Sequence, residues 1–520
     1  MTEKRSFIKG AVILSVSGIL VKLLGAVLRI PLANKLGPGM AYYNAAYTIY
    51  SVFLVLATAG FPVAVSRLIS ERESAGRPAD GRKVFFTALK LMAVMGAVSF
   101  SLCFFGADVI AFAIDIPGAE LSLRAIAPAL CIVPLLSAFR GYFQGKRDMK
   151  PTAVSEVVEQ VIRVVTGLGL GFWLYEEGLD FAAAGATFGA VAGAAAAMAV
   201  IGILYWTRGR GPVGEESSVQ ILKKILWIAV PIVIGAEIMP LMSVIDTSLV
   251  VSRLQDTGWQ PEEALNLYSQ YGAYCDTLIS LPQTFTQAIS VSLVPSIAAF
   301  FWQGQRSRVR ENIGISMRMT MLLACPCAAG LFVLAKPIML MLYFDQTENA
   351  LQAAPTLQVM TVGVILLAVS QTATGALQAV GRQTVPVRNL AVGAAVKVVL
   401  TYFLVGLPAV NVKGAALGTN GAYLIALILN IREVKKETGV RFNLLQTCIK
   451  PVTASVLMGI CVYSSYNVIY VWAGNTGATL GSIVLGIAAY GALVLKMGAV
   501  SPAELRALPF GEFLLKVFRV

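Results

Sequence analysis

The chain has 520 residues, of which 57% are hydrophobic and only 13% are charged, and its mean hydropathy is +0.74. This composition excludes a soluble globular protein, and no polar segment is long enough to form a domain outside a membrane. The net charge of +13 by itself would also suit a nucleic-acid-binding protein, so the placement of the charges has to decide.

Apolar runs of about 20 residues, the length that crosses ~30 Å of hydrocarbon, recur along the whole chain. Lipid offers no partners to backbone polar groups, so these runs should be helices. We therefore predict an all-α polytopic membrane protein with about fourteen spans. They lie at 8–32, 41–63, 84–107, 121–140, 152–175, 181–206, 225–251, 268–300, 312–335, 352–379, 385–407, 413–431, 447–472 and 478–496.

The Lys and Arg residues outside these spans or at their ends follow a strong side preference. Thirty lie at the two termini and on alternate connections, including 67–83, 140–150, 306–310 and 432–450, whereas the opposite connections carry only four. Cytoplasmic loops of membrane proteins carry such an excess, so both termini are predicted to be cytoplasmic. This alternation favours membrane topology over nucleic-acid binding as the reason for the basic charge.

The two halves of the chain resemble each other at an offset of 232–234 residues. Pro62 matches Pro295, Gly141 and Gln144 match Gly375 and Gln378, Arg163 matches Lys397, and Thr187-x-Gly189-Ala190 matches Thr419-x-Gly421-Ala422. Six spans separate the equivalents, so both copies have the same orientation. A parallel repeat of this kind is typical of secondary transporters, with two lobes related by a pseudo-twofold axis along the membrane normal.

This repeat predicts the domain organisation. Residues 1–207 form an N-terminal lobe of spans 1–6, 208–224 a cytoplasmic linker, 225–432 a C-terminal lobe of spans 7–12, 433–497 spans 13 and 14, and 498–520 a cytoplasmic tail.

Charged residues inside the spans are the main functional signal. Seven are basic, namely Lys22, Arg29, Lys90, Arg124, Arg163, Arg318 and Lys397, and five are acidic, namely Glu156, Glu159, Glu237, Asp246 and Asp276. A cation at mid-helix costs roughly 2.5–3.5 kcal/mol by insertion scales, so such residues normally face a polar cavity or a partner. The basic excess predicts an anionic cargo.

Helical spacing groups several of these charges. Lys22 and Arg29 are seven residues apart and share one helix face, where they line a cavity unless Arg29 reaches the outer interface. Glu156, Glu159 and Arg163 also share a face, and Glu159 and Arg163 have the favourable order for an ion pair. That pair is either purely structural or positions Arg163 for cargo.

Two further acids remain open in role. Asp246 is a candidate to neutralise a cation, bind Na⁺ or cap a kinked helix, and Asp276 lies near the predicted outer interface. The chain has no histidine and no phosphate-binding G-x-x-x-x-G-K-[ST] loop. Cys325-Pro326-Cys327 is better explained as small residues around a helix kink than as a metal site, so we expect no metal and no cofactor.

Several strings resemble a known family over nearly the whole chain. They are ATAGFPVAVSRLISE, RGYFQGKRDMKPTAVSEVVEQVIRV, LPQTFTQAISVSLVPSIA, ATGALQAVGRQTVPV and GAALGT. Together they resemble the polysaccharide-transporter branch of the multidrug/oligosaccharidyl-lipid/polysaccharide exporter superfamily, and within it the stage V sporulation protein B group, relatives of MurJ-type lipid II flippases. The resemblance implies a multidrug-exporter-like or MurJ-like fold, with two six-helix lobes around a cationic cavity and two further helices grooving a lipid tail.

The resemblance also assigns residues. The basic residue three positions before Leu-Gly in lipid II flippases corresponds to Lys22, and their second arginine lies one position before Arg29. Where those flippases carry an arginine and an acid in span 8, this chain has Thr277 and Ser280. These departures leave lipid II and other lipid-linked glycans both open as cargo.

We therefore predict a flippase, not an enzyme, that moves an undecaprenyl-diphosphate-linked glycan from the inner to the outer leaflet of a bacterial cell membrane by alternating access. Lys22, Arg29, Arg163 and Lys397 would bind the diphosphate, and Glu156, Glu159, Asp246 or Asp276 would couple an ion or balance charge. The partners expected are the lipid-linked glycan, membrane lipids and cell-wall enzymes. The alternatives are an exporter of another lipid-linked polysaccharide, a cation-coupled multidrug antiporter, and a non-transporting membrane scaffold.

Overall fold

The computed structural model describes residues 2–208 and 211–499, and all regular secondary structure in that part of the chain is helical. By contacts between residues the chain divides into two compact units, Met1–Ala273 and Tyr274–Val520. Each unit is described by itself below.

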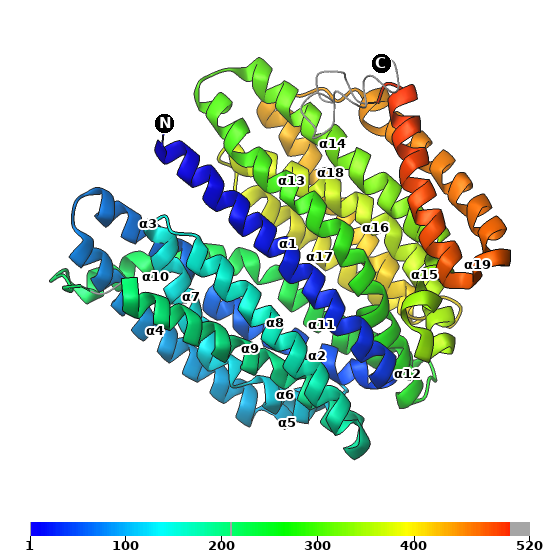
Figure 1. Cartoon of the computed structure of the whole chain (residues 1–520), viewed down its shortest axis with the longest axis horizontal. Helices are drawn as coiled ribbons and strands as arrows, with labels where there is room; N and C mark the ends of the chain where they lie inside the picture. The colour runs from blue at the N-terminus through cyan, green and yellow to red at the C-terminus, as the bar shows by residue number, and fades with distance from the viewer. Residues whose placement is uncertain (1, 209–210, 500–520) are drawn as a thin grey trace. The chain divides into compact units, whose positions relative to one another are not determined.

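The first unit is built from twelve α-helices among its described residues (Figure 1). They are α1 (Thr2–Leu36), α2 (Met40–Thr58), α3 (Phe61–Ser74), α4 (Pro78–Phe105), α5 (Ala107–Ala113), α6 (Glu120–Ile126), α7 (Ala129–Gly145), α8 (Lys150–Trp173), α9 (Leu179–Arg208), α10 (Ser218–Ala236), α11 (Ile238–Asp256) and α12 (Pro261–Ser269). Short helical turns at Gly37–Gly39, Pro117–Ala119 and Leu174–Glu177 connect some of them.

Glycines allow α8 and α9 to lie side by side, as Figure 1 shows. A Cβ added at Gly189 would stand 2.7 Å from the Arg163 carbonyl oxygen, and one at Gly193 would run into the Glu159 carbonyl. Without a hydrophobic driving force in lipid, close approach of backbones through small residues is a main source of helix association. The glycine face of α9, which includes Gly189 and Gly193, is therefore the surface that packs against α8.

Two prolines break the predicted spans 4 and 7. Pro128 separates α6 from α7, and the helical stretches on its two sides are bent by 41°. Pro240 has no N–H to bond the Ala236 carbonyl four residues earlier, and α10 ends at Ala236. Glu237 occupies the resulting break between α10 and α11.

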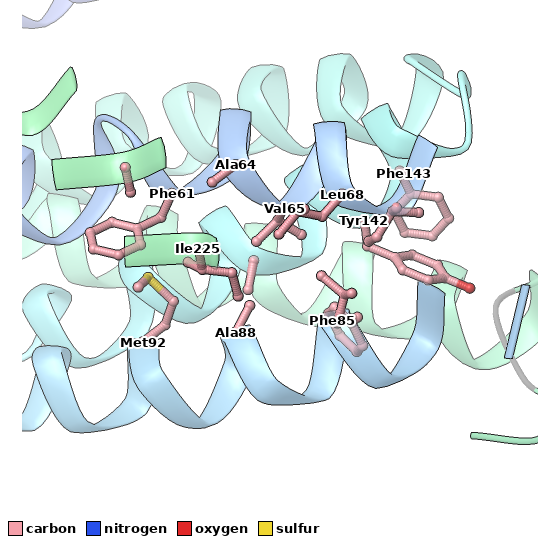
Figure 2. Close-up of a cluster of buried hydrophobic side chains, with 14 of the residues drawn as sticks. Phe61, Ala64, Val65, Leu68, Phe85, Ala88, Met92, Tyr142, Phe143 and Ile225 are labelled. Carbon is pink, nitrogen blue, oxygen red and sulfur yellow. The ribbon is translucent and has the colours of Figure 1, made fainter. Parts of the chain in front are cut away.

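Helix α10 packs against α3 and α4 in the first unit. Residues of α3, α4, α7, α9 and α10 form one buried apolar cluster, in which Phe61 lies near Met92 and Ile225, and Phe85 lies beside Tyr142 (Figure 2). A Cβ added at Gly60 would meet the Ala229 backbone, so the chain just before α3 touches α10 closely. The compact unit thus continues past the predicted linker at 208–224, and the assignment of functional lobes stays a prediction.

The second unit contains seven α-helices in its described part. They are α13 (Asp276–Trp302), α14 (Arg306–Val333), α15 (Ala335–Leu342), α16 (Thr347–Ala379), α17 (Thr384–Val405), α18 (Lys413–Thr438) and α19 (Lys450–Lys496), with helical turns at Phe344–Gln346 and Leu445–Ile449 and another at the unit boundary, Gln270–Cys275. Gly474 interrupts α19 with φ 62° and ψ −172°, a backbone conformation that favours glycine. This break lies between the predicted spans 13 and 14.

The positions at which helices begin and end repeat between the two halves of the chain. α8 and α17 begin at residues 150 and 384, α9 and α18 begin at 179 and 413, and α7 and α16 end at 145 and 379; each pair is 234 residues apart. Gly141 and its equivalent Gly375 both lie close to a neighbouring backbone, that of Pro62 and that of Ser290, although Ser290 stands five residues before Pro295, the match of Pro62. The repeat predicted from four sequence matches is confirmed at the level of elements.

Within the described residues, ten helical runs are long and apolar enough to cross a membrane, and the bent pair Pro117–Ile126 with Ala129–Gly145 would make an eleventh. Two of these runs, Leu20–Ser74 with 55 residues and Leu445–Lys496 with 52, are long enough for two crossings each at about 20 residues per crossing. The chain is a multi-pass membrane protein, and the number fourteen stays a prediction.

Candidate functional site

Helix α8 carries the charged residues on which the candidate site is built. Glu159 and Arg163 are one turn apart on it and only 9% and 7% exposed. An Arg163 terminal nitrogen lies 3.0 Å from a Glu159 carboxylate oxygen, so the ion pair predicted from the spacing of these residues is confirmed. Because burial removes water from both ions, their attraction offsets the cost of desolvation only when the geometry of the pair is good.

Helix α7 adds a second arginine to the same carboxylate. Arg140 donates to the other Glu159 oxygen at 2.9 Å and to the Ser155 hydroxyl at 3.0 Å. Sequence reasoning missed this contact, because Arg140 stands at the end of its span and was counted among the cytoplasmic cations. The signal that existed was the RGYFQG motif, whose arginine precedes the helix-packing Gly141.

A row of tyrosines on α2 brings α1 into the cluster. Tyr43 and Tyr47 stack with ring centroids 6.0 Å apart, and the Tyr47 hydroxyl accepts a hydrogen bond from Arg163 at 3.1 Å. The guanidinium carbons of Arg29 and Arg163 lie 5.9 and 6.0 Å from the centre of the Tyr47 ring, within range of a cation–π interaction. Tyr47 therefore links α1, α2 and α8.

The remaining predicted residues of α1 and α8 differ in their surroundings. Ser17 on α1 donates to Glu156 at 3.3 Å, so this half-buried acid joins α8 to α1. Lys22, which was predicted to share one face of α1 with Arg29, is exposed, and the cations that lie over the Tyr47 ring are Arg29 and Arg163.

We name Arg29, Arg140, Arg163, Glu156, Glu159 and Tyr47 the arginine cluster. It holds three guanidinium groups and two carboxylates, and Glu159 is shared between two of the arginines. Among the contacts of the described chain, the buried Nε of Arg163 has no hydrogen-bond acceptor. Fixed, planar guanidinium donors with a net positive charge suit bidentate binding of a phosphate or carboxylate.

Other predicted site residues lie elsewhere. Asp246 is buried on α11 of the first unit, at 7% exposure. Lys397 is buried on α17 of the second unit, at 9% exposure, and Asp276 is exposed at the start of α13. The arginine cluster thus gathers four of the eight predicted site residues, namely Arg29, Glu156, Glu159 and Arg163.

The structure also emphasises Glu237, which sequence reasoning noted only as an acid in a span. It is 6% exposed at the break between α10 and α11, and neither carboxylate oxygen has a hydrogen-bond partner in the described part of the chain. A buried, unpartnered carboxylate is costly when ionised. Groups of three or more His, Cys, Asp or Glu side chains that could hold a metal do not occur among the described residues.

Comparison with known proteins decides the family. The family model described as "Polysaccharide biosynthesis protein" matches residues 7–301, more than half of the chain, and the MatE model matches residues 272–403. The chain belongs to the polysaccharide biosynthesis protein family. This is a family of membrane transporters rather than enzymes, within the superfamily that the sequence motifs predicted.

Three relatives from Bacillus subtilis strain 168 extend over most of the chain. The uncharacterized membrane protein YabM is 28% identical, covering 99% of this chain and 97% of YabM. The lipid II flippase MurJ is 27% identical, covering 88% of this chain and 87% of MurJ. Stage V sporulation protein B is 26% identical, covering 97% and 98%.

Two solved structures show the fold. Lipid II flippase MurJ in an inward closed conformation matches with a TM-score of 0.67 and 15% identity, covering 92% of this chain and 97% of that one. A multidrug resistance MATE family transporter in an inward-facing conformation also gives 0.67, with 14% identity and coverage of 82% and 98%. The predicted MATE-like and MurJ-like fold is confirmed.

Proposed function

We propose that this protein moves an anionic, polyprenyl-diphosphate-linked glycan, such as a lipid II-like peptidoglycan precursor, from the inner to the outer leaflet of a bacterial cell membrane. Both termini would be cytoplasmic, as the distribution of Lys and Arg predicts. The observation that carries the proposal is the arginine cluster: three arginines against two carboxylates, within helices of a transporter family that includes a lipid II flippase.

The cluster suggests how cargo and protein would exchange partners. Arg163 and Arg140 are held by a single carboxylate, Glu159, so each retains donors for a second anion. A diphosphate entering the site would bind Arg29 and Arg163 from α1 and α8, and we propose Lys22 and Lys397 as further residues that bind the cargo. The sugar would occupy the aqueous cavity and the prenyl chain would stay in lipid.

Energy for the cycle has a sufficient source in the membrane potential. An inside-negative potential favours outward movement of an anion by roughly 2.3 kcal/mol per charge per 100 mV. An ion coupled through Glu156, Glu159, Asp246 or Asp276 would add to this term. The cargo itself, membrane lipids and cell-wall enzymes that use the flipped precursor are the proposed partners.

Complementation of a bacterial strain depleted of its lipid II flippase tests the proposal. Wild type, Lys22→Ala, Arg163→Ala and Lys397→Ala would be compared at matched membrane expression, with Lys436→Ala, an exposed lysine at the end of α18, as control. Rescue by wild type and the control, with loss in Arg163→Ala, is the expected result. Absence of rescue by well-expressed wild type would exclude lipid II, and rescue by every variant would exclude the cationic site.

A cation-coupled multidrug antiporter is the second candidate. The MatE match to residues 272–403 and the buried, unpartnered carboxyl of Glu237 favour it, because an acid in the membrane suits a cationic drug or proton. Expression in a drug-sensitive host separates the two functions. An antiporter would raise resistance to lipophilic cations, and Glu237→Gln would abolish that resistance, whereas a lipid-linked glycan flippase would leave resistance unchanged.

A further inference from the structure

Lys90 is a membrane-helix cation that the proposed function does not use. It is exposed on α4, and Lys83 lies seven residues earlier, two helical turns away on the same face and about 10 Å along the axis. The residues around Lys90 on this face are apolar except for Thr87, so the two lysines form a basic strip that runs from the N-terminal end of α4 toward the middle of the helix.

The two lysines line a groove between α4 and α10. Its volume is about 680 Å³, and besides Lys83 and Lys90 its walls include Phe86 and Val94 from α4 and Val219 and Leu222 from α10. The two basic groups therefore lie along a groove whose other walls are apolar except for Thr87 and Ser218. The groove lies wholly within the first unit, next to the apolar cluster of Figure 2.

The segment preceding α10 closes one side of this groove and is held firmly. Glu216 accepts two hydrogen bonds of 2.7 Å from Arg72, which is 5% exposed. Arg82 donates to the Pro212 carbonyl at 2.7 Å, and the Gly214 N–H donates to the Ala79 carbonyl at 2.8 Å. Val213 of this segment forms part of the groove wall, so this wall is held in place by the hydrogen bonds of the segment.

We infer that this groove binds an anionic glycerophospholipid of the leaflet at the N-terminal end of α4, with the phosphate between Lys83 and Lys90 and an acyl chain along Phe86, Val94 and Leu222. Complementary charge selects the headgroup, since basic pockets between helices on the cytoplasmic side recognise anionic lipids. The flexible stem of Lys90 carries its ammonium group up toward the phosphate. The apolar walls select a lipid over a soluble phosphate.

Lipid binding by the purified full-length protein tests this inference. Native mass spectrometry would compare phosphatidylglycerol with phosphatidylcholine of the same acyl chains for wild type, for Lys83→Gln/Lys90→Gln, and for Lys435→Gln/Lys436→Gln, an exposed pair at the end of α18. We expect wild type and the control to prefer phosphatidylglycerol several-fold and the groove variant to lose that preference. If all three proteins prefer phosphatidylglycerol to the same extent, the inference is overturned, because Lys83 and Lys90 then do not determine which lipid binds.

A second variant and two competitors keep the test independent of folding and of cargo. Val94→Trp fills the groove without changing charge, and we expect it to lower the number of bound phosphatidylglycerol molecules while the protein stays monodisperse in gel filtration. Undecaprenyl phosphate and inorganic pyrophosphate are added in competition. Displacement of phosphatidylglycerol by either at equimolar concentration would assign the groove to prenyl-linked or soluble phosphates and overturn the choice of a glycerophospholipid.

Discussion

The helix pairs α7–α8 and α16–α17 are equivalent in the internal repeat, but different polar groups join them. In the first unit Arg140 of α7 bonds Ser155 and Glu159 of α8. The residues 234 positions later are Thr374, Asn389 and Gly393. There, Asn430 of α18 donates to Thr374 at 3.3 Å and accepts from Asn389 at 2.9 Å.

The second unit extends this neutral chemistry through its interior. Asn430 also donates to Ser370, and the hydroxyls of Ser290, Thr320 and Thr372 form a further buried chain on α13, α14 and α16. The joint between α7 and α8 is thus ionic and the equivalent joint between α16, α17 and α18 is neutral, although the second unit also buries a cation, Lys397. The comparison indicates that this helical plan can be joined without the Arg140–Glu159 pair, and this agrees with our proposal that the ions of the first unit serve the cargo.

Removing Glu159 should give the largest effect. Glu159→Ala leaves the buried Arg163 and the half-buried Arg140 without their shared counter-charge, at a cost of about 3–5 kcal/mol. We expect a clear fall in the melting temperature of the detergent-purified protein. Glu156→Ala, which removes a half-buried acid bonded to Ser17, is the control from the same helix face and should cost much less. Equal melting temperatures for both variants would contradict the shared role of Glu159.

Close helix packing should matter equally in both copies. A Cβ at Gly393 would stand 2.6 Å from the Ala422 carbonyl oxygen, and one at Gly193 would run into the Glu159 carbonyl. Gly393→Ala and Gly193→Ala should each destabilise by about 1–3 kcal/mol through overpacking. Gly169→Ala on α8 has no atom within 4 Å of the added Cβ, so its melting temperature should be unchanged or slightly higher. A loss confined to one copy would break the equivalence of the packing.

The neutral bridge should cost less than the ionic one. Asn430→Ala leaves the buried amide of Asn389 without its acceptor, and hydrogen bonds between membrane helices contribute about 0.6–2 kcal/mol each. We expect a modest fall in melting temperature and retained complementation in the flippase-depleted strain. Loss of complementation at normal protein levels would show that the neutral network also serves transport.

The smallest effect concerns the segment before α10. Hydrogen bonding and charge from Arg72 lower the pKa of Glu216 below its usual 4.5, so the pair stabilises the fold above that pH and loses its contribution as pH falls through the lowered pKa. Glu216→Gln should cost roughly 1 kcal/mol at neutral pH, because the carboxylate is partly exposed. The melting-temperature difference from wild type should vanish in acid. A difference that persists at low pH would mean that the pair is not what holds this segment.

Local patterns predicted much of this architecture. Apolar runs predicted the helices, four residue matches predicted the repeat, and a four-residue spacing predicted the ion pair of Glu159 with Arg163. Arg140 was missed because its partner lies on another helix, and a contact between two helices leaves no periodic pattern in the sequence of either helix. Asn430 was missed for the same reason, and a neutral amide in a span attracts less attention than a charge.

The most direct test of the central claim is the affinity of the purified full-length protein for an undecaprenyl-diphosphate-linked sugar, measured for wild type, Arg163→Gln and Asn430→Ala. Hydrogen bonds to charged groups contribute about 1.5–3 kcal/mol, so Arg163→Gln should raise Kd at least about tenfold. Asn430→Ala, a change in the neutral network, should leave Kd within about twofold of wild type by the same reasoning. Unchanged affinity in correctly folded Arg163→Gln protein would contradict the assignment of the arginine cluster to the cargo diphosphate.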